Sequence, residues 1–311
     1  MSRLPEKRAG VADVDCSGTQ ALVTGSTSGV GREAALALGR LGADVIVHGR
    51  DPEAGREVVG ELTDIGVDAT FVTADFSDTG DVEALAATVR EETDGLDVLC
   101  NNAGGFFREG RLTGRGVEYT FHVNHLAPYL LTAELLDHLS PGARVVTTAS
   151  AAHKGAELDL DRVERVDDFS AMWAYSHSKL ANVLFASELS RRLEAADREV
   201  TSNSLHPGAI PGSGFARFLP APLPRLVQTL EAVPGVTSVA DGAAELLYAG
   251  VSPRTEGVTG RYFTDQRPVS PSMAARDDDA ARRLWERSAE LLDVTEPLAD
   301  AGESGAPEAE R

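Results

Sequence analysis

Short apolar runs alternate with helical patterns along most of the chain, and this alternation restricts the possible folds more than any other feature. Strand-like runs cover residues 20–24, 43–48, 68–75, 96–100, 144–150 and 198–206. Strands separated by helices form βαβ units, whose right-handed crossovers place helices on both faces of a parallel sheet. We therefore expect an α/β fold, a single doubly wound domain with a mostly parallel sheet.

The remaining patterns divide the chain into a domain and two flanking segments. Helices are predicted to follow the first strand, up to residue 40, and at 52–64, 79–92, 124–138, 173–195, 240–250 and 280–292, with a final strand at 260–263. The domain spans 18–293, after a loose N-terminal arm (1–17) and before a disordered acidic tail (294–311). Five prolines interrupt an apolar segment at 208–238, which we interpret as a substrate lid.

Composition excludes several classes of protein. The 311 residues are 42% hydrophobic, enough for a sizeable core, and 49 acidic against 29 basic residues give a net charge of −20. This charge repels nucleic acids and anionic membranes, and it fits a halophilic origin with an acidic surface. Without a long apolar run or a secretory signal, and with only two cysteines, we expect a cytoplasmic protein with no stable membrane insertion.

A glycine-rich turn follows the first strand. Thr24 opens a T-G-x3-G-x-G sequence whose glycines are Gly25, Gly29 and Gly31, and a helix follows. A strand-to-helix turn directs backbone N–H groups and the positive end of the helix dipole at one point. Glycines leave room for a pyrophosphate, so the turn predicts nucleotide binding. The alternative is a tight turn that binds nothing.

Further segments, in the same order, resemble the short-chain dehydrogenase/reductase family of the classical type. They are Asn101-Asn102-Ala103-Gly104 after the fourth strand, Asn124, Ser150 at the end of the fifth strand, Tyr175-x3-Lys179, and His206-Pro207-Gly208 after the sixth strand. The surrounding sequence is most similar to the retinol-dehydrogenase-like and protochlorophyllide-reductase-like branch. The resemblance covers residues 17–292 and implies a Rossmann-type domain.

Tyr175 and Lys179 lie four residues apart, so they share one face of a helix. An ammonium near a phenol lowers the phenol pKa from its usual value near 10, and the chain has only three lysines. The resemblance implies that Tyr175 is the general acid or base and that Lys179 lowers its pKa and holds the cofactor ribose. It also implies that Ser150 stabilises the substrate oxygen and that Asn124 holds a water linked to Lys179.

The cofactor is expected to be NADP(H), with NAD(H) possible. Arg50 lies at the end of the second strand, where an arginine accommodates a 2′-phosphate, and Arg32 adds positive charge. Asp51 is the opposing residue, but Asp51-Pro52 also fits a helix N-cap and first turn. The predicted cofactor-binding residues are Gly25, Ser26, Ser28, Gly29, Val30, Gly31, Arg50, Asp75, Phe76, Asn102, Ala103, Gly104, Tyr175, Lys179, Pro207 and Gly208.

These features predict a carbonyl reductase or alcohol dehydrogenase for a small apolar alcohol, aldehyde or ketone. Two alternatives are a non-catalytic NADP-binding sensor or scaffold and a sugar-nucleotide epimerase; the latter has a different glycine spacing. Apolar helix stripes allow a homodimer. No metal site is expected: His122 and His125 have helical spacing but lack further ligands, and Cys100 is predicted to be a buried strand residue.

Overall fold

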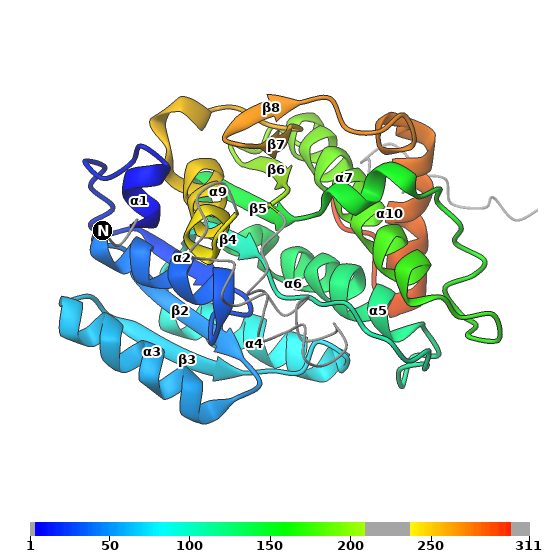
Figure 1. The fold of residues 1–311 in the computed structure, drawn as a ribbon, viewed down its shortest axis with the longest axis horizontal. Coiled ribbons are helices and arrows are strands. Elements are labelled where there is room, and N and C mark those ends of the chain that lie inside the picture. Colours follow the sequence, from blue (N-terminus) through cyan, green and yellow to red (C-terminus); the bar gives the residue numbers. More distant parts are fainter. Residues whose placement is uncertain (1–3, 209–236, 300–311) are drawn as a thin grey trace, which may run out of the picture.

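In the computed structural model, which describes residues 4–208 and 237–299, the strands form one sheet with the order β3-β2-β1-β4-β5-β6-β7-β8 (Figure 1). Neighbouring strands are parallel except β7 and β8. The strands are β1 (Gln20–Val23), β2 (Asp44–Gly49), β3 (Ala69–Thr73), β4 (Leu96–Asn101), β5 (Leu139–Thr148), β6 (Thr201–Leu205), β7 (Tyr262–Thr264) and β8 (Arg267–Val269). The predicted doubly wound, Rossmann-type architecture is confirmed.

Helices cover both faces of the sheet. The helices are α1 (Pro5–Arg8), α2 (Gly29–Arg40), α3 (Pro52–Ile65), α4 (Thr79–Glu92), α5 (Tyr119–Phe121), α6 (Ala127–Leu135), α7 (Ala171–Ala195), α9 (Val239–Val251) and α10 (Asp278–Leu292). A π-helix, η1 (His122–Leu126), joins α5 to α6; short 3-10 helices are η2 (Leu136–His138), η3 (Ala151–Gly155), η5 (Pro253–Thr255) and η6 (Ala274–Arg276). One hydrophobic cluster lies between the sheet and helices α4, α6, α7 and α10. A second cluster, on the other face, lies between the sheet and helices α1, α2, α3 and α9.

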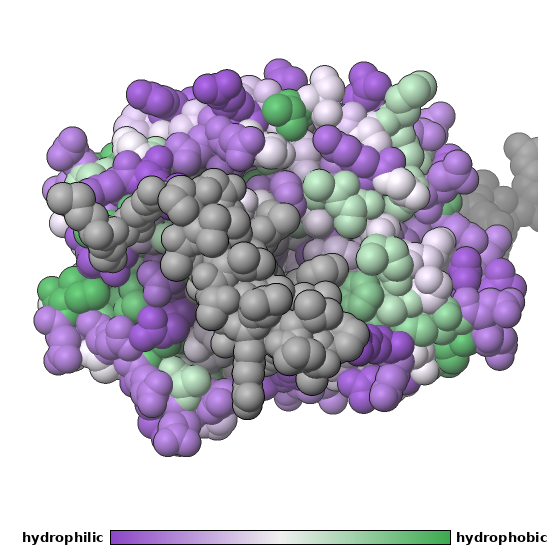
Figure 2. Space-filling model, in the orientation of Figure 1, coloured by the Kyte–Doolittle hydropathy of each residue, from purple (hydrophilic) through white to green (hydrophobic). Residues whose placement is uncertain are grey.

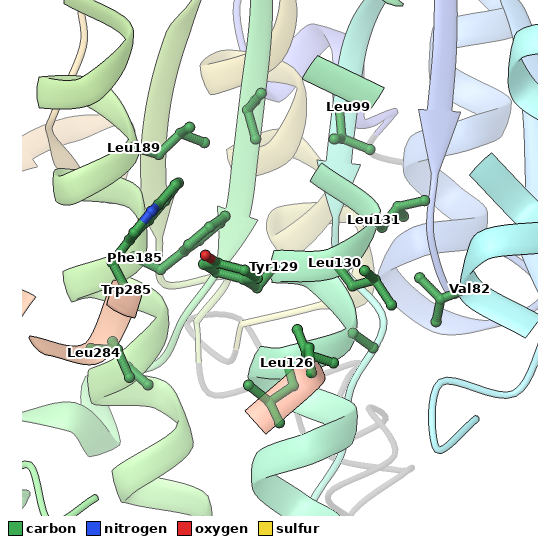
Figure 3. Packing of buried hydrophobic residues seen from close by; sticks show 14 of the residues in the cluster. Val82, Leu99, Leu126, Tyr129, Leu130, Leu131, Phe185, Leu189, Leu284 and Trp285 are labelled. Atoms are coloured by element: carbon green, nitrogen blue, oxygen red, sulfur yellow. The ribbon is translucent and has the colours of Figure 1, made fainter. Parts of the chain in front are cut away.

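Aromatic side chains fill the core beneath α7. Tyr129 of α6 meets Trp285 of α10 edge to face, with ring centroids 4.9 Å apart, and Phe185 of α7 stacks on the same indole (Figure 3). Such rings bury large apolar areas and pack in these offset geometries. This cluster joins α7 to α6 and α10.

The strand order reverses between β1 and β4. β1 lies between β2 and β4, and Val23 of β1 is level with Cys100 of β4. In open α/β sheets the crevice at such a reversal, beyond the carboxyl ends of the strands, is where ligands bind. The fold therefore brings together the segments that follow β1, β2, β4, β5 and β6.

Capping residues explain where several helices begin. Asp51 accepts backbone N–H bonds from Glu53 and Ala54, and Pro52 occupies the first turn of α3, which confirms the interpretation of this pair as a helix start. Gly66 ends α3 with a left-handed φ of 102°. These local signals explain why the predicted bounds of α3, 52–64, nearly match the observed ones.

The N-terminal segment differs from the loose arm expected from its polar sequence. Residues 4–17 include the helix α1, which contacts α9 and α2. Val11 is fully buried, and Glu6 pairs with Arg40 of α2 at 3.0 Å. A few apolar residues among many charged ones are enough to anchor the segment. The overall polarity of residues 1–17 does not reveal them.

Three other predictions concern segment ends. The tail packs on the domain as far as Leu298, which contacts the core, and Trp285 donates to the Pro297 carbonyl. Residues 300–311, and residues 209–236 of the predicted lid, lie outside the described residues. The final strand is followed by an unpredicted partner, β8, after a turn at Asp265 and Gln266, both with positive φ.

Polar side chains are frequent on the face of the molecule seen in Figure 2. Hydrophilic side chains cover most of the visible surface around the uncertain residues (Figure 2). Among the described helices, none has a stretch both long and apolar enough to cross a membrane.

Candidate active site

A cavity of about 850 Å³ lies at the carboxyl edge of the sheet, where the strand order reverses. Its lining comes from the ends of β1 to β6 and the segments after them, from Val123 of η1 and from the first turns of α7. All the predicted site residues line it except Ser26 and Asn124. Its size falls within the range of small-molecule and cofactor sites.

The glycine-rich turn forms one end of the cavity. Gly25 has a left-handed φ of 67°, a conformation that glycine adopts without strain. A Cβ on Gly31 would lie 2.4 Å from the Gly25 carbonyl oxygen and 2.6 Å from Asn102 Nδ2, so this position has no room for a side chain. The first turn of α2 follows directly, and Gly29, Val30 and Gly31 line the cavity; the first N–H groups of a helix have no partner within the helix. This cradle fits the pyrophosphate of a dinucleotide.

A hydroxyl joins this turn to the segment after β4. Thr24 Oγ1 accepts from the backbone N–H groups of Asn102 and Ala103, both at 2.9 Å, and donates to the Cys100 carbonyl. The Asn102 side chain donates to the Thr24 carbonyl at 2.9 Å. The two cavity walls are therefore fixed relative to each other by hydrogen bonds.

At the other end of the cavity, α7 supplies a phenol and an ammonium. Ser170 caps the helix by accepting from the Trp173 N–H, and Tyr175 and Lys179 follow on one face. Lys179 is buried, and its Nζ donates to the Thr148 carbonyl at 3.0 Å. The same ammonium lies 5.8 Å from the centroid of the Tyr175 ring. The helical spacing therefore places both groups as the sequence predicted.

Burial is the main influence on the pKa of Tyr175. Burial raises it above its usual value, and a side-chain hydrogen bond with Ser150 lowers it by less. Burial also lowers the pKa of Lys179 to about 8. Desolvation of a phenol disfavours its charged form, and the Lys179 ammonium donates instead to the Thr148 carbonyl.

Asn124 lies within η1, the π-helical turn that interrupts the helix. It is fully buried, and its Oδ1 accepts from the Gly105 N–H at 2.8 Å. Its Nδ2 donates to the Gly105 carbonyl and to Ser178 Oγ. A Cβ on Gly104 would lie 2.7 Å from Asn124 Oδ1 and 3.6 Å from Lys179 Nζ. In this arrangement the Asn124 side chain braces the segment after β4 rather than opening into the cavity.

The sequence matches known proteins over nearly its whole length. The sequence model of the family described as "short chain dehydrogenase" matches residues 19–218. The chain belongs to the short-chain dehydrogenase family. Retinol dehydrogenase 14 of Mus musculus is 36% identical over 292 residues, covering 89% of this chain and 86% of that protein. These matches confirm the predicted family and its retinol-dehydrogenase-like branch.

Two further matches extend the comparison. Polyprenol dehydrogenase of Mus musculus is 36% identical over 278 residues, covering 86% of this chain and 82% of that protein. The crystal structure of a short-chain dehydrogenase from Burkholderia cenocepacia in complex with NADP is 27% identical, with a TM-score of 0.65 and coverage of 84% of this chain and 98% of that chain. Family membership makes the protein an oxidoreductase that acts on alcohol or carbonyl groups.

Two predicted contributors have other partners. Ser26 is fully buried: its Oγ donates to the Val23 carbonyl at 2.6 Å and accepts from the His48 N–H at 3.0 Å. Arg32 is absent from the cavity lining and pairs with Glu61 and Glu33. Ser26 therefore ties the turn to β1 and β2, and Arg32 is directed toward Glu61 of α3.

Two histidines that the sequence did not single out as functional support the site. His153 Nδ1 donates to the Ser150 carbonyl at 2.7 Å, and its Nε2 accepts from the Ser272 N–H, so the ring fixes the backbone at Ser150. His48 contacts the glycine-rich turn. The only sequence signal for either was its position beside a strand end.

Two histidines with helical spacing, His122 and His125, lie in the core. His122 and His125 are buried, and within the described residues no cluster of metal-ligating side chains forms. His125 instead contacts Ser288 of α10 at 2.9 Å. Cys100 is also buried, and burial raises the pKa of its thiol to about 12, which rules out a reactive thiolate near neutral pH.

Replacing Gly31 by alanine is expected to weaken dinucleotide binding at least tenfold and to lower the free energy of unfolding by about 1–3 kcal/mol. The added methyl group would overlap the Gly25 carbonyl oxygen, so the cradle must shift. Fluorescence titration with NADPH and urea unfolding measure the two effects. Gly60→Ala on α3 is the matched control, since its Cβ has nothing within 4 Å; an equal result in both variants would contradict the cradle.

Proposed function

We propose that the protein is an NADP(H)-dependent oxidoreductase that reduces a carbonyl group or oxidises an alcohol by hydride transfer. The observation that carries the proposal is the meeting of Tyr175, Ser150 and Lys179 at one end of a cavity whose other end is a glycine cradle. A non-catalytic sensor would need the cradle but not the three polar groups.

Tyr175 is the group that moves a proton. Its phenol gives a proton to the carbonyl oxygen during reduction and takes one from the hydroxyl during oxidation. Ser150, hydrogen-bonded to that phenol, donates to the same oxygen as negative charge develops there. When bound, the nicotinamide cofactor supplies or accepts the hydride.

Lys179 supports this proton transfer through its positive charge. A positive charge this close to the phenol favours the phenolate. Its ammonium has three N–H groups, and the Thr148 carbonyl takes one, so others are available to cofactor ribose hydroxyls. Asn124 keeps the segment after β4 against α7 through Gly105 and Ser178, which holds the wall opposite Tyr175 in place.

Arg50 supports a preference for NADP(H). It lines the cavity, its side chain is 64% exposed, and its nearest acidic partner is Asp75 at 3.9 Å. A guanidinium held this loosely can turn to bind a 2′-phosphate. Asp51 accepts the N–H groups of α3, so this acid is already engaged as a cap.

Replacing Arg50 by alanine is expected to raise the Kd for NADPH by about 10–100-fold, the value of a charge-assisted hydrogen bond. The Kd for NADH should change by less than about threefold, because NADH has no 2′-phosphate. Titration of both nucleotides measures the ratio. Arg56→Ala, an exposed arginine of α3 outside the cavity, is the control; equal losses for NADPH and NADH would refute the assignment.

The substrate end of the cavity favours an apolar molecule. Phe106, Phe107, Val123 and Met172 line the cavity beside Tyr175, and the Phe106 ring lies 5.6 Å from the Tyr175 ring. The names of two relatives, retinol dehydrogenase and polyprenol dehydrogenase, refer to long apolar alcohols. We infer an apolar alcohol, aldehyde or ketone as the substrate class.

The deciding experiment measures NADPH oxidation against a panel of apolar aldehydes and ketones, and NADP⁺ reduction against the matching alcohols. The assays run in low and in high KCl, because the net charge of −20 suits concentrated salt. Turnover supports the proposal. NADPH binding without turnover in either direction would favour a sensor instead.

A further inference from the structure

His48 bridges three strand ends around the cavity. It lies near the end of β2, with its side chain buried. Its Nδ1 accepts from the Gly25 N–H at 3.1 Å, and its Nε2 lies 3.1 Å from the Ala74 carbonyl oxygen. A carbonyl can only accept, so Nε2 carries the proton and Nδ1 is the acceptor. The two contacts therefore select one neutral tautomer.

Burial keeps the ring in this neutral state. It lowers the pKa of His48 to about 4, so the acceptor at Nδ1 is present throughout the neutral range. The backbone of residue 48 also holds the turn, since its carbonyl accepts from the Ser26 N–H at 2.8 Å. Any residue supplies that backbone contact; the two ring contacts need an acceptor and a donor on the same side chain.

The ring also forms part of the cavity wall. His48 stacks on Phe76, with centroids 4.5 Å apart and planes 19° from parallel, and both residues line the cavity. Phe76 follows β3, and Gly25 follows β1. The ring thus touches the cradle on one side and the aromatic wall on the other.

We propose that His48 is a positioning residue for the dinucleotide. It fixes the glycine-rich turn relative to Phe76, so that the pyrophosphate cradle and the wall for the adenine half keep one spacing. The inference rests on the proposed function, because it needs a bound dinucleotide. Loss of the Nδ1 acceptor would leave the Gly25 N–H without its partner and free a turn that already has left-handed backbone.

Two amide variants separate this role from simple packing. His48→Asn keeps an acceptor at the position of Nδ1, within reach of the Gly25 N–H. His48→Gln is one bond longer, so its amide reaches toward the Ala74 carbonyl and leaves Gly25 unpaired. Glutamine is closer to histidine in volume, so a packing role predicts that glutamine is the better replacement. A positioning role predicts that asparagine is.

The experiment is a titration of each full-length variant with NADPH, with a thermal melt to compare folding. We expect the Kd to rise about tenfold in His48→Gln and less than about threefold in His48→Asn. Equal affinities in all three proteins, or tighter binding by His48→Gln than by His48→Asn, would overturn the inference alone. If the unmodified protein binds neither NADPH nor NADH, the proposed function and this inference both fail.

Discussion

Replacing Tyr175 by phenylalanine is expected to lower turnover by about 10²–10⁴-fold, the usual contribution of a general acid or base. The ring and its contact with Phe106 remain, and only the phenolic oxygen is lost. The Kd for NADPH should change little, because the cradle and Arg50 lie at the other end of the cavity. Steady-state kinetics and fluorescence titration separate the two quantities.

Tyr248→Phe is the control for this prediction. Tyr248 is a buried tyrosine on α9, and α9 covers the face of the sheet opposite to α7. Tyr248 is absent from the cavity lining. It should keep full turnover. Wild-type turnover in Tyr175→Phe would contradict the proposed mechanism. Loss of both turnover and NADPH binding would indicate that the substitution disrupts the structure of the cavity.

Acid should destabilise this protein strongly through its buried histidines. Burial lowers the pKa values of His48, His122 and His177 to about 4 and that of His125 to about 3. These rings stay neutral in the fold, but in the unfolded chain they bind protons below about pH 6.5. The stability they contribute is therefore complete above pH 6.5 and falls as the pH drops toward 4.

Each of the four histidines lowers the free energy of unfolding by about 1.4 kcal/mol per pH unit in the middle of this window. The sum is of order 5 kcal/mol per unit, comparable with the whole stability of a typical domain. Urea unfolding at intervals between pH 7 and 5 measures the slope.

Carboxylates also titrate in this range, so a variant is needed to isolate the histidines. His125→Gln removes one titrating ring and keeps a group that can contact Ser288, the present partner of Nε2. The free energy of unfolding of this variant should fall less steeply as the pH drops, because unfolding takes up about one proton fewer. Parallel pH profiles for the variant and the unmodified protein would contradict the assignment.

The parts of the site that the sequence predicted are those encoded by neighbours along the chain. The Gly25–Gly31 turn, the Asn102–Gly104 segment and the four-residue spacing of Tyr175 and Lys179 each act within one strand end or one helical turn. The alternation of strands and helices then places these segments at the same sheet edge. Local pattern and topology were enough to locate the cavity.

The parts that it missed depend on contacts between distant residues. His48 and Gly25 are 23 residues apart, and His153 meets Ser272 across 119 residues. Such contacts need the final strand order and one ring tautomer, which no spacing rule encodes. The raised pKa of Tyr175 is similar, because it results from burial in the folded protein and not from spacing along the chain.

The Thr148 carbonyl is an acceptor that no substitution at position 148 removes. The Thr148 oxygen accepts from Lys179 Nζ and from Asn182 Nδ2, both at 3.0 Å, so β5 holds α7 at two points one helical turn apart. Every amino acid carries a main-chain oxygen, so exchanges at position 148 leave this acceptor in the chain. Substitutions in the walls around the substrate can therefore change specificity, while the main chain of β5 still positions α7 relative to Ser150.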